Sequence, residues 1–158
     1  MSTDISDLIA AFASGPEKVC SLTQQLSDVQ LDAVPVAGKW SIRQVICHLV
    51  DADLEYCQRI KRVLVEDNPT LQELVPDEFA AALHYQARNI PEELDLLAAT
   101  RRHLAAILKA TDVENFQRTA VHSAEGPMTL ETLLERITGH IDHHVAFIDE
   151  KLKALDGV

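Results

Sequence analysis

The sequence has no long hydrophobic run and few basic residues, and each shortage excludes a class of protein. No apolar stretch approaches the roughly 18 residues that a membrane-spanning helix needs. Lys and Arg number 14 against 25 Asp and Glu, which gives a formal net charge of −11. Nucleic acids and anionic lipid surfaces require a basic face, so we expect neither a nucleic-acid nor a membrane partner. We interpret the acidic surface as a source of solubility.

Cysteine is also scarce. Cys20, Cys47 and Cys57 are odd in number and show no C-x-x-C spacing. This pattern favours reduced thiols in a helical core over a disulfide framework. The first residues, Met1–Asp4, lack the basic and hydrophobic segments of a signal peptide. We therefore expect a cytoplasmic protein.

Regular alternation of apolar and polar residues is absent as well. No segment keeps a period of two over any length, so strands are not expected, and neither internal repeats nor low-complexity tracts occur. The hydrophobic content of 47% is high enough to exclude disorder, and 158 residues is near the usual size of one domain. The sequence thus predicts a single all-α domain over residues 1–158.

Apolar residues recur with a helical period in four long segments. We predict that the first helix is broken or bent near Gly15 and Pro16, because proline disfavours a helical residue before it. The predicted main helices cover residues 5–26, 41–66, 91–110 and 129–155. The predicted connections are a loop at 27–39, an irregular segment at 71–76 followed by a short helix at 77–85, and a segment at 111–127 with a helical turn at 113–116.

Two histidines of the last predicted helix are the first candidate site residues. His140 and His144 are four residues apart, a spacing that turns a helix by about 400° and projects both from one face. That face is the apolar stripe containing Ile137 and Ile148, where a bundle core expects Leu or Ile. Buried imidazoles need partners, so we interpret the pair as metal ligands, with satisfied core histidines as the alternative. His143 is displaced from the stripe and is not expected to be a ligand.

His48 is the third candidate ligand. It lies on the inward face of the helix predicted at 41–66. Alone it would indicate a core histidine, but with two other inward histidines it indicates a metal ligand. Three imidazoles leave at least one coordination position open for water or substrate, as in a reactive site. Zinc and nickel both accept imidazole, so the divalent metal is not identified. Cys47 points about 100° away and is not counted as a ligand.

Three weaker candidates lie near the predicted ligands. Asp51, three residues after His48, could accept the imidazole N–H that metal-bound histidines usually donate. Glu55 could bind a substrate or orient a ligand, although an ion pair with Arg59 at i+4 is the favoured role. His122, in the connection before the last helix, could approach the mouth of the site, with a bystander role favoured. Two nearby aromatic residues are interpreted as packing residues: Trp40 and Tyr56.

The segments around these histidines carry a family resemblance. Residues 38–45 (GKWSIRQV) and 47–55 (CHLVDADLE) resemble the second-helix signature of the DinB/YfiT-like superfamily, and residues 121–130 (VHSAEGPMTL) resemble its approach to the last helix. Residues 139–144 (GHIDHH) are similar to its metal-binding H-x-x-x-H segment. The resemblance spans nearly the whole chain. It implies a four-helix bundle with up-down-down-up connectivity and a divalent metal on His48, His140 and His144.

The resemblance also implies a range of activities. Members include transferases in which the metal activates a low-molecular-weight thiol such as bacillithiol or mycothiol, a mycothiol-dependent isomerase, and many proteins that are hydrolases by name only. We therefore expect a metal-dependent enzyme acting on a small molecule, with thiol transfer ahead of hydrolysis by metal-bound water. A non-catalytic metal-binding or small-ligand-binding bundle is the competing interpretation. The resemblance further implies a homodimer, and apolar residues beyond those needed for a core are compatible with one.

Overall fold

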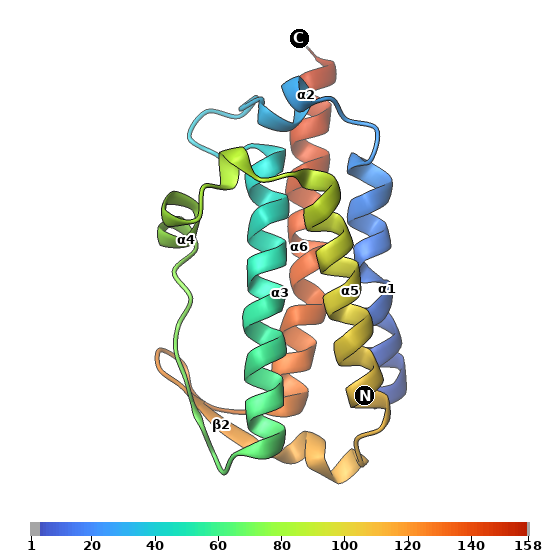
Figure 1. Ribbon diagram of the computed structural model, residues 1–158, viewed down its shortest axis with the longest axis vertical. Helices are drawn as coiled ribbons and strands as arrows, with labels where there is room; N and C mark the ends of the chain where they lie inside the picture. The colour runs from blue at the N-terminus through green and yellow to red at the C-terminus, as the bar shows by residue number, and fades with distance from the viewer. Residues whose placement is uncertain (1–3, 158) are drawn as a thin grey trace.

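Four long helices form the bundle in the computed structural model, which describes residues 4–157 (Figure 1). The helices α1 and α6 rise in Figure 1, whereas α3 and α5 descend, and α1 and α3 each pack against both α5 and α6. The predicted bundle of helices is thereby confirmed. Residues 1–3, on which the prediction about a signal peptide partly depends, lie outside the described residues. The bounds of the four helices are α1 Ile5–Thr23, α3 Ile42–Val65, α5 Ile90–Lys109 and α6 Leu130–Asp156.

Side-chain caps set where the long helices begin. Ser41 accepts a hydrogen bond from the backbone N–H of Gln44, whose side chain in turn accepts from the Ser41 N–H. This capping box satisfies two backbone donors that a helix start leaves unpaired. Asn89 and Thr129 cap α5 and α6 in the same way, each accepting from the N–H three residues ahead. The predicted starts at 41, 91 and 129 therefore lie within one residue of the observed ones.

A long return segment joins α3 to α5. Because both helices descend in Figure 1, the chain between them has to climb back along the bundle. It does so through β1 (Thr70–Leu71), α4 (Pro76–Ala82) and the 3-10 turn η1 (Tyr85–Ala87), which lie outside α3. The predicted short helix at 77–85 corresponds to α4 and η1. This return segment forms one wall of the site described below.

The prediction that strands are absent is wrong. β1 pairs in parallel with β2 (Thr119–His122), and β2 pairs antiparallel with β3 (Gly126–Thr129), so the sheet order is β1-β2-β3. Strands of two to four residues are too short to show a period of two, and β1 pairs with a strand 51 positions further along the chain. The predicted turn at 113–116 is confirmed as the 3-10 helix η2 (Val113–Gln117).

Two further segments differ from the prediction. The loop expected at 27–39 contains the short helix α2 (Asp28–Asp32), which begins with a capping box of Ser27 and Gln30. Of the break or bend expected near Gly15 and Pro16, the break does not occur, and α1 is continuous through both residues. Proline has no N–H, so the carbonyl of Phe12 loses its normal donor four residues ahead. The side chain of Arg101 replaces that donor, with Nη1 2.9 Å from the Phe12 oxygen.

Arg101 joins all four long helices at the centre of the bundle. From α5, its guanidinium forms an ion pair with Asp53 on α3, with Nε 2.6 Å from Oδ1, and donates to the Ile137 carbonyl on α6 at 2.7 Å. The two charged side chains are 0% and 1% exposed. Gly15 gives the guanidinium room, because a Cβ there would lie 2.5 Å from the Arg101 Nη1. Arg101 therefore accounts for two residues of α1: it occupies the space that Gly15 leaves, and it supplies the donor that Pro16 lacks.

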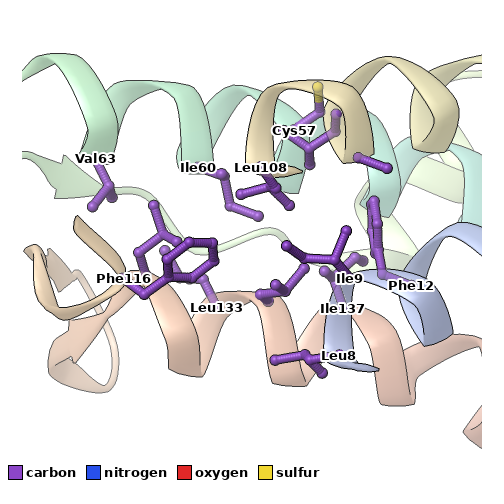
Figure 2. Packing of buried hydrophobic residues seen from close by; sticks show 14 of the residues in the cluster. Leu8, Ile9, Phe12, Cys57, Ile60, Val63, Leu108, Phe116, Leu133 and Ile137 are labelled. Carbon is purple, nitrogen blue, oxygen red and sulfur yellow. The ribbon is translucent and has the colours of Figure 1, made fainter. Parts of the chain in front are cut away.

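Apolar side chains fill the bundle on both sides of this ion pair. Figure 2 shows one of the two core clusters, in which side chains from α1, α3 and α6, among them Phe12, Ile60 and Leu133, fill the space between the helices. The aromatic ring of Phe116 on η2 closes the end of this cluster. Across residues 4–157, no helix combines the length and apolar character that crossing a bilayer requires.

Candidate metal centre

Three histidines from two helices meet on the inner side of the bundle. His48 on α3 and His140 and His144 on α6 each offer a ring nitrogen, and these nitrogens all lie within 4.8 Å of one another. The Nε2 atoms of His48 and His140 are 3.0 Å apart. Neighbouring ligands of a tetrahedral zinc ion, with Zn–N bonds of about 2.0 Å, would lie about 3.3 Å apart. The structure thus brings together the three histidines that the sequence selects, in a spacing compatible with a divalent metal.

All three imidazoles are held in the neutral form. Burial, together with the smaller effect of the neighbouring histidines, lowers the pKa of His140 to about 3 and that of His144 to about 4. Burial also lowers the pKa of His48, against the opposing charge of Asp51. Only a neutral imidazole has a lone pair to offer a metal, so no proton has to be displaced at neutral pH.

The buried Nδ1 atoms of His48, His140 and His144 have no hydrogen-bond partner among the described residues. The expected hydrogen bond from the His48 imidazole to Asp51 is not formed. The two oxygens of Asp51 instead accept from the Nη1 and Nη2 atoms of Arg88 at 2.9–3.0 Å. This corrects the role predicted for Asp51, which acts on His48 through its charge alone. Buried polar atoms without partners cost free energy, so a ligand that engages these Nδ1 atoms would stabilise the site.

His143 stays outside this group, as expected. Its side chain is exposed, and its ring stacks edge-on against His144 and Phe147, with centroids 5.2 and 4.8 Å apart. His143 also lines an open cavity in front of the three histidines. The helical position of each histidine therefore separates the inward pair on α6 from its exposed neighbour.

An open cavity of about 630 Å³ lies in front of the three histidines. Its walls come from α3 and α6, from the return segment after β1, and from the β2–β3 hairpin. A smaller cavity of about 220 Å³ shares Trp40 and His144 with the large one. The large cavity has the size of a small-molecule site. Besides the three histidines its lining includes Trp40, Tyr56, Arg59, Glu73, His122, Glu125, Arg136 and His143.

The two other weak candidates take different places. His122 is buried on β2 and lines the cavity, and its Nδ1 accepts a hydrogen bond from the Ala124 N–H at 3.2 Å. Glu55 is half-buried and does not form the expected ion pair with Arg59. The Arg59 guanidinium instead donates to the carbonyl of Gln72 in the return segment. Of the two, only His122 therefore adjoins the candidate site.

Two residues assigned to packing contribute directly to the site. The ring of Trp40 packs against His48, with centroids 5.2 Å apart. Tyr56 lines the cavity one helical turn from Ala52, beneath the guanidinium of Arg59. The helical period of α3 could have suggested Tyr56, because it follows Ala52, another residue that lines the cavity, by four positions. No local signal indicates that Trp40, which precedes the helix, reaches the site.

The lowered histidine pKa values predict a pH-dependent stability of the metal-free protein. The unfolded chain binds protons at its histidines below pH 6.5, whereas folded His140 and His144 bind them only near pH 3 and 4. The free energy of unfolding should be constant above pH 7 and fall between about 6.5 and 4, by up to about 1.4 kcal/mol per pH unit for each histidine. Urea unfolding at several pH values measures this slope. A variant with His140→Leu and His144→Leu should lose most of it, and an equal slope in that variant would contradict the assignment.

Comparison with known proteins agrees with this geometry. The sequence matches the family model of the DinB superfamily over residues 11–148, and the chain belongs to that superfamily. It is 31% identical over 148 residues to a protein of Geobacillus thermodenitrificans, covering 92% of this chain and 82% of the other. A protein of Halalkalibacterium halodurans is 28% identical over 149 residues, covering 94% and 86%. Both relatives carry the name "Putative metal-dependent hydrolase".

A solved structure shares the fold. YfiT from Bacillus subtilis, described as having an unusual four-helix bundle topology, superimposes with a TM-score of 0.92 over 99% of this chain and 90% of its own. The two sequences are 24% identical, so this likeness bears on the fold alone. The match to the family model confirms the superfamily that the sequence resembles.

Proposed function

We propose that the protein is a metal-dependent enzyme that transfers a low-molecular-weight thiol to a small electrophilic substrate. The observation that carries this proposal is the convergence of three neutral imidazoles at the edge of an open cavity of about 630 Å³. His48, His140 and His144 would hold the ion. A divalent ion there supplies a Lewis acid that favours the deprotonated form of a thiol or of water. In the balanced reaction, a thiol R–SH and an electrophile R′–X give R–S–R′ and HX.

The residues around the histidines favour thiol transfer over hydrolysis. A thiol loses its proton near pH 8.5, so it needs a far smaller shift of its pKa than water does. Hydrolysis commonly uses a carboxylate as a general base as well. Asp51 is engaged by Arg88, and Glu125 in the cavity wall pairs with Arg136 at 2.6 Å. Among the described residues of the wall, this leaves Glu73 as the one carboxylate without an ion pair, and it belongs to the return segment rather than to a helix that carries a ligand. Hydrolysis is the second candidate, supported by the names of the relatives.

Activity assays on the metal-loaded protein test the proposal. We expect the zinc-loaded or nickel-loaded protein to consume bacillithiol, mycothiol or cysteine together with chlorodinitrobenzene, and His140→Ala to lose this activity. Hydrolysis of p-nitrophenyl esters without any thiol would support the second candidate instead. A protein that binds metal but turns over neither set of substrates would contradict both and support a non-catalytic bundle. The thiol, the choice of zinc or nickel, a homodimeric state and a cytoplasmic location belong to the same proposal.

A further inference from the structure

One of the three buried arginines has no acidic partner. Arg43 binds Asp28 and Asp32, and Arg101 binds Asp53. Arg59 is only 5% exposed, yet it forms no ion pair among residues 4–157. Burying a charge is costly unless the charge is paired. The charge of Arg59, unlike the charges of Arg43 and Arg101, is therefore not neutralised by an acidic side chain of the described residues.

The contacts of Arg59 hold its guanidinium in place without neutralising it. One Nη atom donates to the Gln72 carbonyl, and the guanidinium lies 5.0 Å from the centre of the Tyr56 ring. A guanidinium has five N–H donors, so most of them remain available. Each guanidinium nitrogen of Arg59 either has a hydrogen-bond partner or keeps some exposed surface. The residue also lines the large cavity. A molecule in the cavity can thus reach the free donors.

The acidic residues of the cavity wall do not supply the missing charge. Glu125 is taken by Arg136 on α6. Glu73 is exposed in the return segment and forms no ion pair with Arg59. A positive charge at the far end of the cavity is therefore left for an anion from outside the chain.

Arg59 and His48 lie along one line of α3. Arg59 follows His48 by eleven residues, which returns it to within about 20° of the same azimuth and places it about 16 Å along the helix. Helical side chains lean toward the N-terminus, and the contact of Arg59 with Tyr56, three residues earlier, shows this lean. The guanidinium therefore lies about 10–15 Å from the imidazoles. A molecule with its reacting group at the histidines and an anionic group at Arg59 would span this length.

We propose that Arg59 binds a carboxylate at the far end of the substrate or thiol, so that the site selects small molecules whose carboxylate is separated from the reacting group by about six to eight bonds. A carboxylate matches the planar fork of a guanidinium, which can donate two parallel hydrogen bonds. Only the position of the reacting group rests on the proposed function. Binding of the carboxylate follows from the unpaired charge.

Two matched pairs of probes test this specificity. On nickel-loaded protein, 6-mercaptohexanoate should bind at least about tenfold more tightly than 6-mercaptohexanol, measured by the thiolate-to-nickel absorption band. On metal-free protein, hexanoate should likewise be preferred over hexanol in ligand-observed NMR. Arg59→Met should reduce both preferences to near unity, and Arg59→Lys should retain part of them. The exposed Arg62→Met is the control, because Arg62 pairs with Glu66 on the same helix.

The ratio of the two affinities separates recognition from a structural role. If Arg59 only fastened the return segment at Gln72, its loss would weaken both probes of a pair equally. An unchanged ratio in Arg59→Met or in Arg59→Lys, with helical content retained by circular dichroism, would overturn the proposal. Equal binding of both mercaptans to wild-type protein would also overturn it, while leaving the metal site intact. Failure to bind nickel with a retained preference for hexanoate would refute the proposed function and support the role of Arg59.

Discussion

Replacing His140 or His144 with Ala is expected to abolish stoichiometric binding of zinc or nickel, whereas His143→Ala should leave it intact. His140 and His144 place ring nitrogens within 4.8 Å of the His48 nitrogen, and His143 is exposed beside them. Removing one of three ligands leaves too few to hold the ion at its original position. Metal content after dialysis, measured by atomic emission, reports the outcome. Equal loss of metal from all three variants would show that the face of α6 from which a histidine projects does not decide whether it binds the metal.

The same variants should lose the stabilisation that metal provides. A ligand that binds only the folded state stabilises it by about 2.7 kcal/mol at 100-fold excess over its dissociation constant. We expect the chelated wild-type protein to remain helical, because its two apolar clusters do not depend on the histidines, but to melt at a lower temperature. Added zinc or nickel should restore the melting temperature of wild type and of His143→Ala, but not that of His140→Ala or His144→Ala. A melting curve that saturating metal leaves unchanged would remove the energetic support for the site.

Breaking the ion pair at the bundle centre is expected to have the largest effect on stability. Arg101→Met leaves Asp53 buried without a partner, and the loss of one member of such a pair costs about 3–5 kcal/mol. The carbonyls of Phe12 and Ile137 lose a donor at the same time. Urea unfolding at pH 7 measures the change. Burial already raises the pKa of Asp53 against the effect of Arg101, so part of the loss should be recovered at low pH as the carboxyl takes up a proton.

A stepwise repair tests whether each contact of Arg101 contributes separately. Replacing both charges, with Asp53→Leu and Arg101→Met, removes the unpaired carboxylate and should recover much of the stability. The Phe12 carbonyl would still lack a donor, at a cost of about 1–3 kcal/mol. Adding Pro16→Ala supplies the missing backbone N–H and should recover part of that cost. If Arg101→Met alone changed the free energy of unfolding by less than about 1 kcal/mol, the ion pair would not hold the helices together as described.

Local information accounts for the helices and for the facing direction of the three histidines. A helix places residues four apart on one face regardless of what surrounds it, so the pairing of His140 with His144 and the exclusion of His143 could be derived from spacing. Capping residues such as Ser41 and Thr129 act within three residues of themselves, and the helix starts were predicted closely for that reason. The inward position of His48 follows from the same period.

Pairing partners distant in sequence account for what the sequence analysis missed. Arg88 lies 37 residues after Asp51 and takes its carboxylate away from His48. The Gln72 carbonyl draws Arg59 away from Glu55, although those two residues have the i,i+4 spacing of a favourable helical pair. In both cases the interaction expected from spacing along one helix is replaced by an interaction with a residue that only the folded chain brings within reach.

The sequence alone determined the bundle of helices and the three inward histidines, because both depend on a period that repeats within one helix. The tertiary structure alone decided the cavity in front of them. Its outer wall is the return segment after β1, held by a parallel pairing of Thr70 with Val121 across 51 positions of the chain. Such a pairing leaves no repeating pattern in strands of two to four residues. The same segment contacts Arg59 through the Gln72 carbonyl, and among the described residues none of its acids forms an ion pair with that arginine.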